Sequence, residues 1–188
     1  MRSDRVRSAA AVAAALISVG MASACSDAPT EGWKQLEGDR LSLEVPEEFT
    51  EDEGSGERWT TAVRGDDVSV QVADPFDNSR IISSALGRMH LASTLGLDDW
   101  EPGEVRDIEV DGADSALIQT FTYADGGDTA KGAWIIVGQT QPATTVAVAI
   151  AGTGADTELI NHVKDSLVYE HSEERVDQDG KPLDADAS

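Results

Sequence analysis

The chain is poor in cysteine, in aromatic side chains and in bases. Its 188 residues include one Cys, 5% Phe, Trp and Tyr together, and 14 Lys and Arg against 36 Asp and Glu, which gives a net charge of −22. One cysteine excludes an intramolecular disulfide. Such an excess of acid argues against a nucleic-acid partner, because the phosphate backbone would be repelled.

Long hydrophobic runs are also missing, with one exception near the start of the chain. Ala9–Val19 is apolar except for Ser18, and three arginines precede it within the first seven residues. A basic start, a short apolar run and a small-residue site are typical of a secretory signal. A membrane-spanning helix needs about 20 apolar residues, so we expect the mature chain not to span a bilayer.

The only cysteine lies where this signal should be cut. Ala22-Ser23-Ala24-Cys25 resembles the lipobox of bacterial lipoproteins, in which the cysteine thiol receives a diacylglyceryl group and becomes the first residue. Lipoboxes usually carry Leu where this chain has Ala22, and Ala-Ser-Ala also suits ordinary secretion, which remains the alternative. We predict cleavage after Ala24, lipidation of Cys25 and anchoring to the outer face of the cell membrane, since two or three acyl chains bind stably.

The processed chain is still more acidic. Without residues 1–24, which hold three Arg and one Asp, 11 bases and 35 acids remain, a net charge of −24. Such a charge is compatible with an extracytoplasmic space. Two explanations remain open: the proteins of the source organism are acidic in general, or the charge serves to recognise a specific partner. The remaining length suits one domain with its own core.

Polarity and hydrophobic pattern divide the chain into four parts. We predict a signal peptide over 1–24, a lipidated flexible tether over 25–32, one α+β domain over 33–169 and a disordered acidic tail over 170–188. Trp33 marks the start of the domain.

Alternating and apolar stretches predict an antiparallel sheet of about six to seven strands. Asp111-Gly112 and Gly65-Asp66-Asp67 are turn signals, and Leu97–Pro102 is expected to be an acidic loop. The expected strands are 41–45, 58–63, 68–72, 105–110, 116–123, 133–137 and 144–151.

Two stretches with helical spacing predict two helices that pack on this sheet. The first should be capped by Asp77 or Asn78, run to about Leu95 and end at Gly96. The second should be capped by Asp156. The expected apolar stripes are Ile82, Ala85, Leu86, Met89 and Ala92 on the first helix and Leu159, Ile160, Val163 and Leu167 on the second.

This order of elements resembles the PsbP-like fold. The features that carry the resemblance are a short strand ending at Val45-Pro46, a hairpin, a helix, the Val110–Ala113 turn, a long meander and a closing helix. With the lipoprotein signal in front, the chain resembles the LpqN-like lipoproteins of actinobacteria over roughly residues 33–169. The resemblance implies an accessory or binding role in the cell envelope, in some relatives tied to envelope lipids, and usually no enzyme activity.

No complete catalytic or metal-binding pattern is present. His90, His162 and His171 lack metal spacing and are expected to be structural or solvated. Gly54-Ser55-Gly56 has the wrong spacing for a nucleophile elbow, and Gly152-Thr153-Gly154 lacks the third glycine of a phosphate loop. We therefore predict no cofactor, no metal and no catalytic residue.

Acidic loops offer one alternative to this prediction. Asp98-Asp99, or Asp125 with Asp128, could lie near a calcium ion, although solvated loops explain them as well. Asp177-Gln-Asp179-Gly180 begins like a calcium loop, but Lys181 and Pro182 do not suit the ligand positions that follow.

Tryptophan gives the remaining hint of a binding site. Trp59 and Trp134 are expected in strands and in the core. Trp100, in a predicted loop, could line a ligand cleft, or it could be an apolar plug packed on the sheet.

Three functions remain open on this basis. The first is a binding or accessory module that holds an apolar or glycolipid-like ligand, or a protein partner, between the sheet and a helix. The second is a carboxylate-dependent hydrolase of envelope glycans, which needs two carboxylates about 5–9.5 Å apart. The third is a passive lipoprotein that docks to another envelope protein through an apolar patch.

Overall fold

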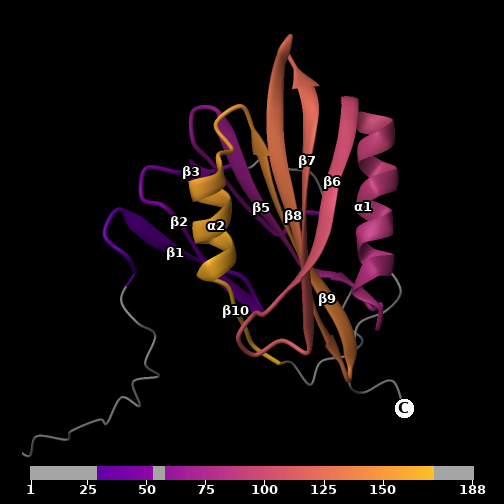
Figure 1. Ribbon diagram of the computed structural model, residues 1–188. Helices are drawn as coiled ribbons and strands as arrows, with labels where there is room; N and C mark the ends of the chain where they lie inside the picture. Colours follow the sequence, from indigo (N-terminus) through magenta and orange to yellow (C-terminus); the bar gives the residue numbers. More distant parts are fainter. Residues whose placement is uncertain (1–28, 53–57, 172–188) are drawn as a thin grey trace, which may run out of the picture.

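Seven antiparallel strands form the main sheet of the computed structural model, which describes residues 29–52 and 58–171 (Figure 1). Their order is β3-β4-β5-β9-β8-β7-β6. The predicted signal peptide, Ala24, Cys25 and residues 172–188 of the predicted tail lie outside the described residues. The strands are β3 (Thr50–Glu51), β4 (Thr61–Arg64), β5 (Val68–Asp77), β6 (Asp98–Ile108), β7 (Ser115–Asp125), β8 (Asp128–Thr140) and β9 (Ala143–Gly152).

A second, three-stranded sheet lies against the main one. It has the order β1-β2-β10, with β1 at Trp33–Glu37, β2 at Leu41–Pro46 and β10 at Val168–Tyr169. The strand predicted at 41–45 is confirmed, and its alternating apolar residues are buried. Strand β1 was not predicted, because four of its five residues are only partly buried and no clean alternation marks it.

The two central strands are apolar because both faces of the main sheet are covered. Every residue from Ala133 to Gln139 is buried, which confirms the prediction that 133–137 is a central strand. One face packs against the small sheet and α2 (Thr157–Asp165). The other packs against α1 (Ile82–Gly96). The α+β fold class is thereby confirmed, as is the four-strand meander, which is β6 to β9.

The second helix follows its prediction closely. Asp156 caps it by accepting a hydrogen bond from the Leu159 amide at 2.8 Å. The predicted stripe is buried, with Val163 fully enclosed and Leu167 just beyond the helix. The cap residue and the apolar stripe, both local features of the sequence, were therefore sufficient to predict this helix.

The first helix begins later than predicted. Its N-cap is Ile81, which makes no side-chain hydrogen bond. The buried Asp77 carboxylate instead accepts hydrogen bonds from the Ser79 amide at 2.6 Å and from the Thr145 hydroxyl at 2.9 Å. The segment before α1 is thereby bonded to strand β9. The helix ends at Gly96 as predicted, but Ala92 of the predicted apolar stripe is exposed.

The prediction of an acidic loop at Leu97–Pro102 is wrong. Strand β6 begins at Asp98 and pairs with β7 through two register shifts, one before Glu101 and one after Pro102. Pro and Gly within the segment indicated a loop, whereas the edge of the sheet tolerates both residues at bulges. Trp59 precedes β4 and lies outside any strand.

Both ends of the described chain are held against the domain. In the segment assigned to the tether, the Thr30 amide donates to Glu44 at 3.1 Å and the Gly32 carbonyl accepts from the Glu47 amide at 3.0 Å. In the segment assigned to the tail, the Glu170 amide donates to the Arg40 carbonyl at 2.7 Å. No helix within 29–52 and 58–171 is long and apolar enough to cross a membrane.

Candidate functional site

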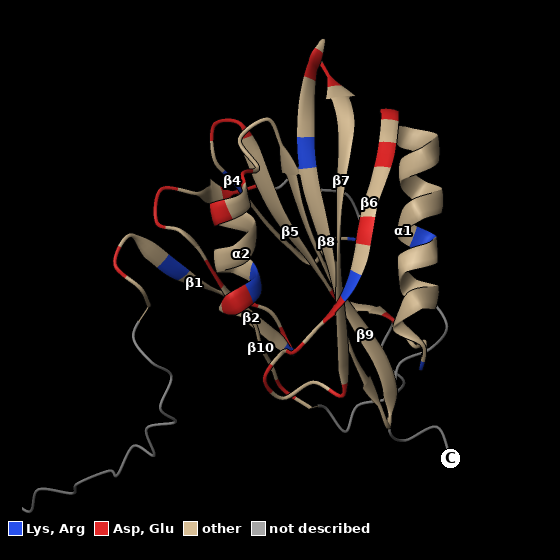
Figure 2. Cartoon of the chain, viewed as in Figure 1, with Lys and Arg blue, Asp and Glu red and all other residues tan. Residues whose placement is uncertain are grey.

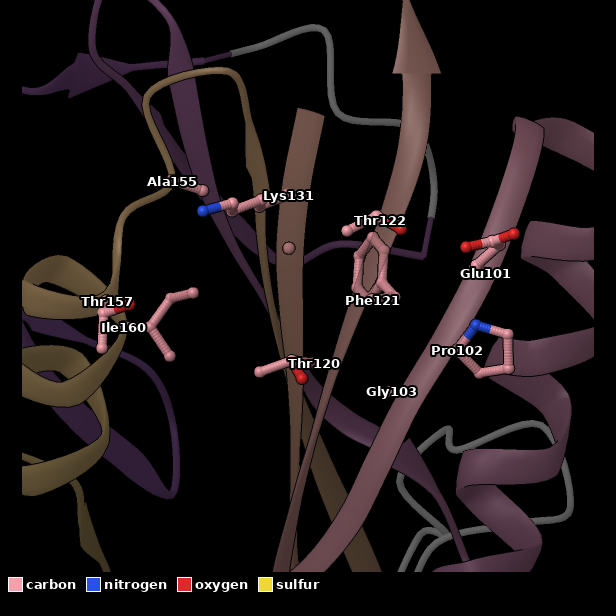
Figure 3. A pocket seen from close by; sticks show the side chains of 11 residues that line it. Glu101, Pro102, Gly103, Thr120, Phe121, Thr122, Lys131, Ala155, Thr157 and Ile160 are labelled. Carbon is pink, nitrogen blue, oxygen red and sulfur yellow. The ribbon is translucent and has the colours of Figure 1, made fainter. Parts of the chain in front are cut away.

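A groove lies between α2 and the β6–β7–β8 side of the main sheet, with a volume of about 360 Å³ (Figure 3). We call it the α2 groove. Strands β6, β7 and β8 supply one wall, and the start of α2 with the residue Ala155 before it supplies the other. The residues that line it are Glu101, Pro102, Gly103, Thr120, Phe121, Thr122, Lys131, Gly132, Ala155, Thr157 and Ile160.

Two glycines occupy the strands beside the groove, and neither position has room for a side chain. A side chain at Gly132 would meet the Phe121 ring, 2.2 Å from the position of its Cβ. One at Gly103 would meet the Thr120 hydroxyl at 2.6 Å. Real Cβ atoms do not approach other atoms this closely, so both positions require glycine. Gly103 thereby leaves the Thr120 hydroxyl in the lining, whereas the Phe121 ring packs on Trp134 in the cluster on the α1 side of the sheet.

Charge is arranged in a row across the groove. Thr122 of β7 is the register partner of Lys131 on β8 and of Glu101 on β6, so a cation, a hydroxyl and an anion follow one another across three neighbouring strands. Figure 3 shows the Lys131 ammonium directed toward Ala155, away from Glu101. Within the described part of the chain Lys131 makes no ion pair. In a molecule covered with acid (Figure 2), this leaves one cation in the groove that is available to a ligand.

The groove is supported from behind by the α1 side of the sheet. The buried Gln119 side chain donates to the Gly103 carbonyl at 2.8 Å, at the second register shift of β6. The Gln119 carbonyl oxygen is in turn bonded to the His90 imidazole of α1. His90, expected to be structural or solvated, is thus part of a hydrogen-bonded chain that fixes the bulge. Sequence reasoning missed this, since nothing local links His90 to Gly103.

Trp100, the residue predicted to line a ligand cleft, lies on strand β6 and packs toward the α1 side. Its ring stacks on the buried Trp134 with centroids 5.7 Å apart and meets His90 edge-on at 5.2 Å. It also borders a second hollow of about 480 Å³ that shares Glu101 and Thr122 with the α2 groove. Contact of Trp100 with a ligand stays a prediction. The packing of its ring on Trp134 agrees with the alternative, an apolar side chain packed on the sheet.

Acidic residues do not gather into a metal site in the described segments. Within residues 29–52 and 58–171, no three or more His, Cys, Asp or Glu side chains lie close enough to one another to hold a metal ion. Asp125 and Asp128 face each other across the β7–β8 turn, and Asp98-Asp99 begin β6. Asp177 and Asp179 lie outside the described residues. The α2 groove itself has one carboxylate in its lining, Glu101.

Titratable groups with perturbed pKa values lie away from the groove. Burial raises the pKa of Glu44, but hydrogen bonds from His162 and from the Thr30 amide outweigh it and hold that pKa below its usual range. The His162 ring also stacks on Trp33, with centroids 3.5 Å apart. Burial raises the pKa of Asp74 despite its ion pair with Arg40. Both carboxylates contact residues at the start of the described chain, Thr30 and Arg40.

Comparison with known proteins finds likeness in fold only. No sequence family matches the chain, and no curated protein matches it. The Ran-binding protein Mog1p of Saccharomyces cerevisiae superposes with a TM-score of 0.52 at 14% identity, over 73% of this chain and 95% of that one. LpqN of Mycobacterium tuberculosis, described as involved in cell envelope biogenesis, superposes with a TM-score of 0.50 at 11% identity, over 74% and 91%. The resemblance to LpqN-like proteins therefore holds at the level of the fold.

Proposed function

We propose that this protein is a non-enzymatic binding or accessory module of the cell envelope, anchored through Cys25 to the outer face of the membrane. Its α2 groove would take the apolar part of an amphiphilic ligand of the envelope. The fold shared with LpqN, a protein of envelope biogenesis, supports the setting. The sequence pattern around Cys25 supports the anchor.

The α2 groove is the observation that carries the proposal. Ile160 and Pro102 give it apolar side chains that can bury hydrocarbon, while its threonine hydroxyls can bond a polar head. Small-ligand sites combine an apolar lining with a few polar groups and begin near 300 Å³. The groove meets both conditions at about 360 Å³.

The chemistry of the groove favours binding over hydrolysis. A glycan hydrolase of the kind considered above needs a pair of carboxylates on opposite sides of the substrate. Among the residues lining the groove Glu101 is the only acid, and it stands at an edge strand beside solvent. A retained amphiphile needs no second carboxylate.

A fluorescent amphiphile tests the groove directly. Anilinonaphthalene sulfonate should bind the full chain and lose affinity by about 10-fold, or 1.4 kcal/mol, when Thr120→Trp fills the groove. Thr50→Trp on β3 is the matched control, because that exposed strand lies at the opposite edge of the main sheet. Equal affinity in all three proteins would contradict the proposal. Native mass spectrometry of protein from its own membranes should find a co-purifying amphiphile.

The anchor has a separate test. Cys25→Ser removes the thiol that would carry the acyl groups, so the variant should leave the membrane fraction for the soluble one. Retention of the serine variant in membranes, measured by fractionation and immunoblot, would rule out the lipid anchor while leaving the groove proposal intact.

A further inference from the structure

Lys131 is the only base in the lining of the α2 groove, and it makes no ion pair with any residue in 29–52 or 58–171. The two other lysines in the same ranges are engaged. Lys164 contacts Asp165 at 2.6 Å, and Lys34 donates to the Phe49 carbonyl. In a chain with 36 acids and 14 bases, the Lys131 ammonium is thus left without a counter-charge at the edge of a hollow.

This ammonium lies at the α2 wall of the groove. Figure 3 shows it directed toward Ala155, on the same side as Ile160, whereas Glu101 lies at the opposite wall on β6. Lys131 and Glu101 are both register partners of Thr122 on neighbouring strands. Two strand spacings place their backbones about 9–10 Å apart. The groove therefore has a positive wall at α2 and a negative wall at β6.

The acid that follows Ala155 in the chain does not neutralise the positive wall by contact. The Asp156 carboxylate accepts a hydrogen bond from the Leu159 amide at 2.8 Å, as the cap of α2, and it is outside the lining. The lining at this wall consists of an ammonium, which only donates hydrogen bonds, and the Thr157 hydroxyl, which can donate one. A group of donors with a positive charge is complementary to an anion.

We propose, on the basis of the amphiphile-binding function above, that the α2 groove selects amphiphiles whose head group is an anion and binds that charge at Lys131. Phosphate, sulfonate or carboxylate oxygens of the head accept hydrogen bonds from the Lys131 ammonium and the Thr157 hydroxyl. The apolar tail lies against Ile160. Glu101 repels the head from the β6 wall, so the ligand enters in one orientation.

The acidity of the whole protein does not prevent this selection. At physiological salt the Debye length is about 8 Å, so carboxylates on distant surfaces are screened while a charge in contact with Lys131 is not. Within the lining, Lys131 balances Glu101. Removing the lysine charge leaves Glu101 alone and makes the lining negative. A partly exposed ion pair of this kind contributes up to about five-fold in affinity.

Two fluorescent probes with the same ring system test the charge of the head. Anilinonaphthalene sulfonate carries an anion, and phenylnaphthylamine is its uncharged analogue. In the full chain with Lys131→Gln, the ratio of sulfonate affinity to amine affinity should fall by about three- to five-fold. Lys131→Arg should keep the ratio of the original chain. Lys164→Gln is the matched control, because it removes the same charge from α2 outside the lining and should leave the ratio unchanged.

Competition separates an amphiphile from a free anion. Dodecyl phosphate should displace anilinonaphthalene sulfonate from the original chain and should do so less well from Lys131→Gln. Inorganic phosphate at the same ionic strength should not displace the probe. Displacement by inorganic phosphate would mean that the site takes a free anion without a tail, and it would overturn the proposal.

The remaining outcomes distinguish this proposal from the function on which it rests. An unchanged affinity ratio in Lys131→Gln, or an equal fall in Lys164→Gln, would overturn the selection for anions. If Thr120→Trp still weakened both probes in that case, the groove would remain an amphiphile site without charge preference. If Thr120→Trp weakened neither probe, the amphiphile-binding function itself would be contradicted.

Discussion

The two faces of the main sheet are covered in different ways. On one face, the small sheet and the nine-residue α2 together cover the centre and leave a groove beside β6 and β7. On the other face, α1 with 15 residues covers β6 to β8 and carries unused apolar side chains on its outside. The first face therefore has a hollow, and the second has an exposed apolar surface.

The largest effect should come from the buried ion pair that joins the small sheet to the main one. Arg40, before β2, contacts Asp74 of β5 at 3.1 Å, and their side chains are 3% and 0% exposed. Arg40→Ala leaves a buried carboxylate without its cation and should lower the free energy of unfolding by about 3–5 kcal/mol.

The control for this experiment is a surface pair. Arg64→Ala breaks the contact with Asp52, in which the arginine is 61% exposed, and should change the free energy by at most about 1 kcal/mol. Because burial raises the pKa of Asp74, the charged carboxylate destabilises the Arg40→Ala fold at neutral pH, and the loss should shrink as the pH is lowered. Urea titrations at several pH values measure both, and equal losses in the two variants would contradict the expected contrast.

Helix α1 should show the next largest effect, and only on its inner side. Leu86 is 5% exposed within the cluster under the helix, so Leu86→Ala should cost about 2–5 kcal/mol. Leu95→Ala, on the outer side, should stay within about 0.5 kcal/mol. The comparison is made by thermal unfolding of both variants. A large loss for Leu95→Ala would mean that its side chain packs within the fold.

The smallest effect should be a dependence on pH on the α2 side. The folded-state pKa of Glu44 lies below its ordinary value of 4.5, so its contribution is present above that value and is lost as the pH falls through the lowered pKa. Glu44→Gln should therefore be less stable than the original chain at pH 7, and the difference should shrink below about pH 4.5. Glu37→Gln, at the exposed end of β1, serves as control. A constant difference would show that the charge of Glu44 contributes nothing.

The sequence was sufficient where the signals are local and periodic. Asp156 precedes an apolar stripe at helical spacing, and Ala133–Val137 is too apolar to face water, so α2 and β8 could be predicted from neighbouring residues alone. The start of α1 was missed because Asp77, a good helix cap by type, bonds to Thr145 of a distant strand instead. Residues 98–104 were missed because Pro102 and Gly103 are tolerated only at the bulged edge of a sheet, which local sequence does not reveal.

The α2 groove could be predicted as a class but not as a set of residues. The order of the elements suggested the hypothesis of a ligand held between the sheet and a helix, and the structure has a groove in such a place. Its lining comes from segments that are separated along the chain and joined by strand register, as Lys131, Thr122 and Glu101 are. Trp100 was chosen because an aromatic residue in a loop suggests a gate, and that argument no longer applies to a residue on β6 stacked against Trp134.

The small sheet joins the two ends of the described chain. Its last strand, Val168–Tyr169, pairs with β2 and also meets the β6–β7 turn, where the Tyr169 amide donates to the Asp111 carbonyl at 2.8 Å. Strands β1 and β2 are synthesised first and cannot complete their sheet until residues near the end of the chain arrive. The small sheet is therefore completed only after every strand of the main sheet has been made. A chain that stops before Val168 would leave the edge of β2 without its partner strand.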